Sequence, residues 1–98
     1  IQFLVLAYDK PDQGDKRAEI ASSHSAYRES IRDACITYGS LLTEDGDKAI
    51  GTLTILDAEN IETAKKLWKN DPFVQAGLFD TTEFYRWRFG RIFDQFGA

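Results

Sequence analysis

His24 is the chain's single histidine and the side chain best suited to acid–base chemistry. An imidazole gains or loses a proton near neutral pH, so it can act as a general acid or a general base. A histidine on the inward face of a helix is, however, more often a packed, hydrogen-bonded structural residue. A catalytic interpretation therefore needs a second group that faces the ring.

Asp71 is the candidate for that second group. A carboxylate that contacts an imidazole fixes which ring nitrogen carries the proton, and the two side chains then act as a dyad. The dipeptide Asp71-Pro72 is equally typical of a helix start, with Asp as the cap and Pro as the first helical residue. Both interpretations stay open, because the sequence does not show whether Asp71 meets His24.

Four more residues are candidates for binding a substrate: Arg17, Tyr8, Arg86 and Trp87. Arg17 precedes His24 by two helical turns, and Arg86 alternates with aromatic residues. Guanidinium groups beside aromatic rings suit a small planar anion. Each has an ordinary alternative. Arg86 would be a solvent-exposed charge on an edge strand, and Tyr8 would be a core residue whose hydroxyl reaches water.

Composition narrows the class of protein. The 98 residues predict a single domain over residues 1–98, which is too small to enclose a deep pocket alone, so a dimer could supply the missing wall. The hydrophobic fraction of 43% excludes a disordered chain, and no apolar run approaches the length of a membrane span. The net charge of −4 argues against binding along a nucleic-acid backbone.

Cys35 is the only cysteine. A single cysteine excludes a disulfide framework within the chain and leads us to expect a reducing, cytoplasmic setting. We expect Cys35 to be a small buried residue rather than a nucleophile. One histidine and one cysteine provide no zinc constellation, so we expect no metal site and no cofactor.

Hydrophobic periodicity predicts the elements that must position these residues. Residues 2–8 read as a buried strand, and spacings of three and four over residues 15–38 predict an amphipathic helix that ends at Gly39. His24 lies on the inward stripe of this helix, whereas Arg28 is assigned to its solvated face together with Glu19, Glu29, Arg32 and Asp33.

The rest of the chain predicts a hairpin, a second helix, a single helical turn and a last strand. Residues 40–43 and 49–56 predict a hairpin, residues 60–70 a helix capped by Asn60, and Pro72 a single helical turn that stops at Gly77. Residues 81–89 predict the last strand, with Tyr85, Trp87 and Phe89 on one face and Phe84, Arg86 and Arg88 on the other. Residues 90–98 form a tail with the apolar anchors Ile92, Phe93 and Phe96.

The order strand, helix, strand, strand, helix, strand predicts an α+β, ferredoxin-like βαββαβ fold, a four-stranded antiparallel sheet with both helices on one face. The other face is left bare although its strands are apolar. We therefore expect a homodimer through the sheet faces.

Three motifs resemble the YciI-like, YCII-related family of small proteins: Lys16-Arg17 followed by His24, Gly39-Ser40-Leu41-Leu42, and Asp71-Pro72-Phe73-Val74-Gln75-Ala76-Gly77-Leu78-Phe79. The Asp-Pro-aromatic-Val-x-Ala-Gly block is the most specific of them, and the similarity covers nearly the whole chain. The resemblance implies a dimeric α+β barrel with His24 and Asp71 as the active-site pair. The chain departs from some relatives in its short hairpin turn and from many in the Tyr85–Phe89 ending of the last strand.

The resemblance also implies a reaction class, because the family includes a dehydrochlorinase that acts on a hydroxylated aromatic ring. On this hypothesis His24, oriented by Asp71, moves a proton on such a substrate, and Arg17 or Arg86 stabilises the developing oxyanion. Halide loss, as in a lyase, or isomerisation would follow. The alternatives are a small-molecule or haem-binding module with His24 as ligand, and a regulatory interaction domain in which His24 is a core residue.

Overall fold

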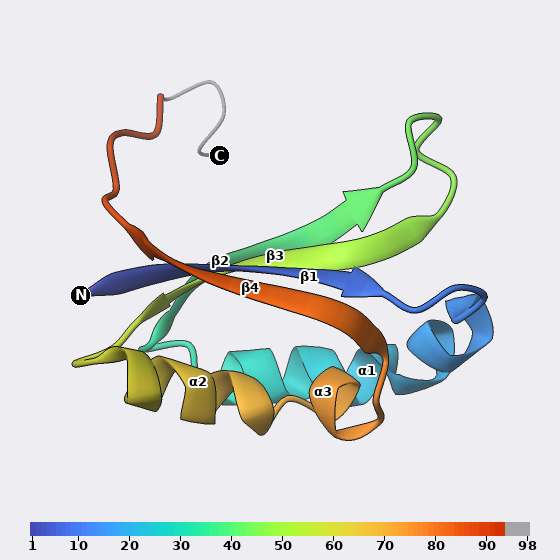
Figure 1. Ribbon diagram of the computed structural model, residues 1–98, viewed down its shortest axis with the longest axis horizontal. Coiled ribbons are helices and arrows are strands. Elements are labelled where there is room, and N and C mark those ends of the chain that lie inside the picture. The colour runs from blue at the N-terminus through green and yellow to red at the C-terminus, as the bar shows by residue number, and fades with distance from the viewer. Residues whose placement is uncertain (94–98) are drawn as a thin grey trace.

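The computed structural model describes residues 1–93, which form a four-stranded antiparallel sheet with all helices on one face (Figure 1). The elements are β1 (Gln2–Asp9), α1 (Gly14–Ser30), β2 (Cys35–Leu42), β3 (Ala49–Asp57), α2 (Ile61–Lys69), α3 (Pro72–Gln75) and β4 (Phe79–Trp87). The strand order is β2-β3-β1-β4, as in a split βαβ unit. The predicted ferredoxin-like fold is confirmed.

Strand β1 lies inside the sheet and presents different residues to its two faces. Successive side chains of a strand point in opposite directions, so every second residue meets the helices. The residues of β1 buried beneath the helices are Phe3, Val5 and Ala7. They pack with Leu56 of β3 and with Ala64 and Trp68 of α2, and this apolar cluster is the hydrophobic core.

The predicted helix over residues 15–38 is too long at its C-terminal end. Helix α1 ends at Ser30, the amides of Ala34 and Cys35 donate to the carbonyl of Ile31, and β2 starts at Cys35. The spacing of Ala34, Cys35 and Tyr38 continues the helical pattern by coincidence, because pairing with β3 decides the conformation here. Gly39 does not end a helix; it pairs with Leu53 within the sheet.

Other boundaries agree more closely with the sequence. Asn60 caps α2 through the amide of Thr63, and Asp71 caps α3 through the amide of Phe73. Gly77 follows α3 with φ of 70°, a conformation that glycine adopts without a steric penalty, so the predicted stop is confirmed. The last strand begins two residues earlier than expected, at Phe79, and ends at Trp87.

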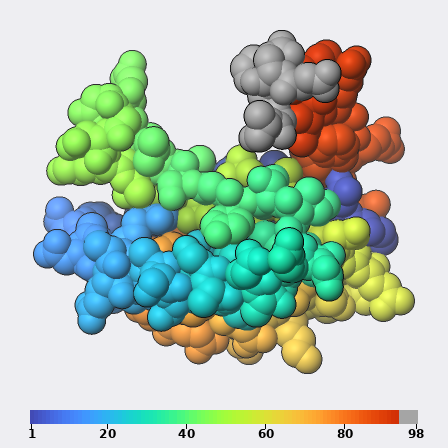
Figure 2. Space-filling model, turned by 180° about the vertical axis from the view of Figure 1, so that it is seen from behind, coloured from blue at the N-terminus to red at the C-terminus, as the bar shows by residue number. Residues whose placement is uncertain are grey.

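The sheet face away from the helices is framed by two projecting segments. The β2–β3 hairpin rises from one end of this face and the chain after β4 rises from the other, with a hollow between them (Figure 2). Ile92 and Phe93 in the second segment are 58% and 50% exposed, so they do not anchor the tail in the core as expected. Phe96, the third expected anchor, lies outside the described residues. None of the helices in residues 1–93 combines the length and apolarity needed to cross a membrane.

Candidate active site

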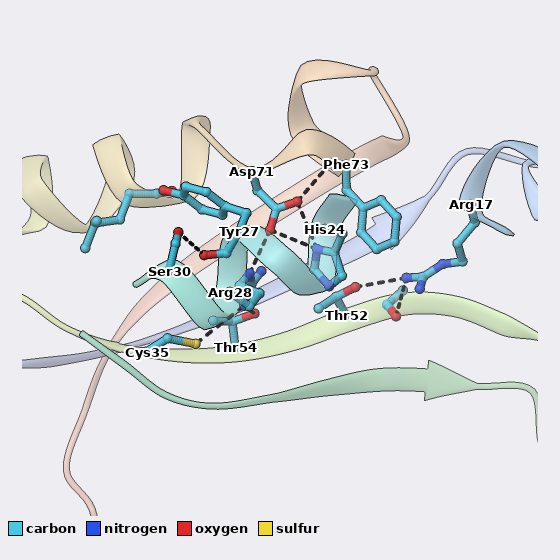
Figure 3. Close-up of polar contacts among 12 residues, drawn as sticks. Arg17, His24, Tyr27, Arg28, Ser30, Cys35, Thr52, Thr54, Asp71 and Phe73 are labelled. Atoms are coloured by element: carbon cyan, nitrogen blue, oxygen red, sulfur yellow. Dashed lines mark hydrogen bonds and ion pairs between the residues drawn. The ribbon is translucent and has the colours of Figure 1, made fainter. Parts of the chain in front are cut away.

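Helix α1 buries three polar side chains against the sheet, at positions separated by seven and four residues. Arg17, His24 and Arg28 are 9%, 6% and 3% exposed, and these spacings place them on one side of the helix. They lie over Thr52 and Thr54 of β3, both of which are buried (Figure 3). A polar row therefore occupies the interface between α1 and the sheet, where apolar residues would normally pack.

His24 and Asp71 meet in this row. The imidazole Nδ1 lies 2.9 Å from each carboxylate oxygen of Asp71, which is 1% exposed. The Asp71 Oδ1 also accepts a hydrogen bond of 2.8 Å from the amide of Phe73, because Asp71 is the cap of α3. The cap and the histidine partner, which the sequence left as alternatives, are thus the same carboxylate.

Aromatic rings hold the imidazole in place. The ring of Phe73 stacks on it with centroids 3.9 Å apart, and the ring of Tyr38 lies edge-on at 5.6 Å. Tyr38 comes from the edge strand β2 rather than from α1, and its side chain faces the helices because it pairs with Thr54. The imidazole is thereby enclosed between α1, α3 and the sheet.

Arg28 is the second partner of Asp71. Its Nε donates to Asp71 Oδ2 at 2.7 Å, and its Nη1 donates to Thr54 Oγ1 at 2.8 Å. The prediction that Arg28 lies on the solvated face of the helix is wrong, because this ion pair carries the guanidinium into the interior. Its position one turn after His24 was the available signal, since residues four apart share a helix face.

These contacts determine the ionisation of Asp71. Burial by itself would raise the pKa of the Asp71 carboxyl, but hydrogen bonds from His24, Arg28 and the Phe73 amide, together with the charge of Arg28, lower it below its usual value. An ionised carboxylate only accepts hydrogen bonds, so Nδ1 of His24 must carry a proton. In the neutral imidazole the lone pair is then on Nε2, which is the arrangement of a general base.

Arg17 forms the other end of the row. Its Nε donates to Asp9 at 2.8 Å, and its Nη2 donates to the carbonyl of Gly51 at 2.7 Å and to Thr52 at 2.9 Å. Its guanidinium also lies 4.8 Å from the centre of the Phe73 ring, the ring that stacks on His24. All its hydrogen bonds within residues 1–93 come from Nε and Nη2, so Nη1 is free to meet a ligand.

A surface cleft of about 890 Å³ reaches this network at Arg17. Its walls are the β1–α1 loop, the first turns of α1 and the start of β3. Ala21, one turn before His24, lies on the cleft wall. The charged lining residues are Asp9, Lys10, Asp12, Asp15, Arg17, Asp47 and Lys48, so the cleft offers both signs of charge to a ligand.

The other candidate residues are not gathered around His24. Tyr8 pairs with Gly51 at the Arg17 end of the sheet, but its side chain is on the face away from the helices. Arg86 and Trp87 pair with Phe3 and Gln2 at the opposite end, where they line a separate hollow of about 580 Å³. Among residues 1–93 no cluster of three or more His, Cys, Asp or Glu side chains is placed to hold a metal ion.

The lowered pKa of Asp71 predicts a specific loss of stability in acid. Because the unfolded carboxyl has the higher pKa, its ionisation stabilises the fold above about pH 4 and this contribution is lost as the pH falls through the native value. Urea unfolding at a series of pH values should show this loss in the wild type. At neutral pH the free energy of unfolding of Asp71→Asn should be about 3–5 kcal/mol lower than that of the wild type, because Arg28 is left unpaired. As the pH falls, the free energy of unfolding of this variant should change less than that of the wild type.

Asp80→Asn is the matched control, because Asp80 is exposed at the start of β4. It should unfold at nearly the wild-type urea concentration and keep the wild-type acid dependence. Equal acid dependence in the wild type and Asp71→Asn would contradict the assignment of an ionised Asp71.

Comparisons with known structures show which proteins share this fold. The structure superposes on 5-chloro-2-hydroxyhydroquinone dehydrochlorinase from Burkholderia phenoliruptrix, solved in complex with 2,5-dihydroxybenzoquinone, with a TM-score of 0.83 and 30% identity over 92% of this chain and 96% of that one. No curated protein matches the chain in sequence.

Two more distant structures share the fold alone. A conserved protein from Methanosarcina mazei has a TM-score of 0.55 at 16% identity, over 89% of this chain and 91% of that one. A candidate antibiotic biosynthesis monooxygenase from Chloroflexus aurantiacus has the same TM-score and identity, over 93% of this chain and 97% of that one.

The family model of the YCII-related domain matches residues 1–88. The chain therefore belongs to the YCII-related, or YciI-like, family.

Proposed function

We propose that this chain is a lyase-type enzyme that uses His24 and Asp71 to transfer a proton on a small hydroxylated aromatic substrate. The observation that carries the proposal is that Nδ1 contacts both oxygens of the ionised, buried Asp71. This contact keeps the proton of the neutral imidazole on Nδ1 and its lone pair on Nε2. The likeness to a dehydrochlorinase over nearly the full length of both chains supports the choice of substrate class.

The substrate would lie in the cleft beside Arg17 and Ala21. A hydroxylated ring has oxygens on its edge, and the free Nη1 of Arg17 suits one of them once it carries negative charge. Tyr38 covers the imidazole edge-on from the edge strand and is 42% exposed, so its movement would admit the substrate to Nε2. Arg86 and Trp87 lie at the other end of the sheet and would take no part in this step.

The reaction can be written as a net loss of HCl. Nε2 takes the proton from one ring hydroxyl and returns it to the carbon that bears chlorine, which gives a keto form. Chloride then leaves with the electron pair of the C–Cl bond as Nε2, free again, takes the proton of a second hydroxyl, and a quinone results. The oxyanion formed in the first step is the species that Arg17 would stabilise.

Removal of the imidazole tests this proposal. His24→Gln should lower kcat for chloride release from a chlorinated hydroxyhydroquinone by about 10²–10⁴-fold, the range typical of a lost general base. Ser25→Ala is the matched control, because Ser25 is the next residue of α1 and is exposed. Both proteins should show the wild-type circular dichroism spectrum. Wild-type turnover in folded His24→Gln would overturn the proposed chemistry.

The bare sheet face supports a homodimer. Leu4 pairs with Tyr85, and Leu6 pairs with Leu53, so these side chains form an apolar surface on the side without helices. Two such faces in contact would remove this surface from water. We include this dimer in the proposal because a second sheet would also cover the hollow framed by the hairpin and the segment after β4.

A charge on the bare face should weaken the dimer. Sedimentation equilibrium should give twice the monomer mass of 11.1 kDa for the wild type. Tyr85→Lys should raise the dissociation constant at least about tenfold, because a buried charge in an apolar interface costs more than 1.4 kcal/mol. Thr82→Lys, on the opposite face of the same strand, is the control and should leave the dissociation constant unchanged. A wild type that stays monomeric at all concentrations would contradict the dimer.

A further inference from the structure

Arg28 is a buried cation for which the proposed chemistry gives no role. It lies one turn after His24 and contacts Asp71 on the carboxylate oxygen that also faces Nδ1 (Figure 3). Its guanidinium is packed 5.0 Å from the ring of Tyr38 and 5.4 Å from the ring of Trp68. Burying a guanidinium this deeply is costly unless a charged partner meets it, so Asp71 specifies the position of Arg28.

Asp71 in turn depends on Arg28 for its charge. An arginine is protonated at any pH that a protein meets, whereas an imidazole is not. The other buried arginine of α1, Arg17, already has Asp9 as its partner at 2.8 Å. Within the described part of the chain, Arg28 is therefore the permanent cation paired with the Asp71 carboxylate.

Loss of Arg28 would leave the carboxylate, 1% exposed, to be neutralised in one of two ways. Asp71 could take up a proton and donate it to Nδ1, and the proton of the neutral imidazole would then move to Nε2. Alternatively, His24 could take up a second proton and become an imidazolium. Both changes put a proton on Nε2, the nitrogen whose lone pair the proposed base uses.

We propose that Arg28 is a positioning residue that keeps Nε2 of His24 free of a proton. It does so by holding Asp71 as an ionised acceptor, with Nε on Oδ2 and Nη1 fixed by Thr54. The importance of this for catalysis rests on the proposed function, but the protonation of the ring can be measured without any substrate.

The single histidine makes that measurement direct. Protein labelled with ¹⁵N-histidine gives one pair of ring nitrogen signals, and their chemical shifts and ring-proton couplings show which nitrogen carries a proton. At about pH 8, where a neutral imidazole is the ordinary form, the wild type should show a protonated Nδ1 and an unprotonated Nε2. A wild-type spectrum with a protonated Nε2 would overturn the inference.

Arg28→Met keeps the length of the side chain and removes its charge and donors. It should shift the Nε2 signal toward the protonated form, and it should lower kcat about 10–100-fold with little change in KM. Arg28→Lys keeps the charge and should retain more of the wild-type spectrum than Arg28→Met. Arg32→Met is the matched control, because Arg32 is 74% exposed and pairs with Glu29 at the surface; its ring signals should match the wild type.

The outcomes separate this inference from the proposed function. Unchanged ring signals in folded Arg28→Met overturn the inference, even if turnover depends on His24. If Arg28→Met does not fold, the wild type and Arg28→Lys still test the inference. Ring signals that report a protonated Nε2 in Arg28→Lys would show that a positive charge at this position does not suffice to keep Nε2 free of a proton. Absence of turnover in the wild type, with the expected ring signals, overturns the proposed substrate and leaves the role of Arg28 intact.

Discussion

The buried carboxylate of Asp71 is the interaction on which the rest of the site depends. It accepts hydrogen bonds from the Phe73 amide in α3 and from His24 and Arg28 in α1, and Arg28 continues to Thr54 in the sheet. A charge that is 1% exposed is tolerated only when its partners are all in place. The α3 turn, the helix and the sheet are therefore held in one arrangement, and the same contacts fix the proton on Nδ1.

The two longer helices meet the sheet in different ways. Helix α2 buries Ala64 and Trp68, as an ordinary amphipathic helix does, whereas the buried residues of α1 are Arg17, His24 and Arg28. Ion pairs therefore hold α1 against the sheet. Apolar side chains in the same places would give comparable stability, and they would avoid the cost of removing charges from water. Departure from the usual pattern on one helix alone is typical of a functional site.

The sequence predicted the fold because short apolar or alternating runs marked the strands, Asn60 and Asp71 marked the starts of two helices, and Gly77 marked the end of α3. It could not predict the end of α1, since residues 34–38 fit a helical period and only pairing with β3 makes them a strand. It identified His24 and Asp71 but not their contact, which links α1 to a segment 47 residues later. Arg28 was missed because an arginine on a helix is normally solvated, and the carboxylate that draws it inward is distant in sequence.

The two ends of the sheet offer different places for a ligand, the cleft beside Arg17 and the hollow beside Arg86 and Trp87. The central claim is that chemistry takes place at Nε2 of His24. A crystal structure with 2,5-dihydroxybenzoquinone, the molecule bound to the dehydrochlorinase, tests it most directly. The account predicts a ligand oxygen within hydrogen-bonding reach of Nε2 and of Nη1 of Arg17. A ligand bound only beside Trp87, with the imidazole still enclosed by Tyr38 and Phe73, would contradict it.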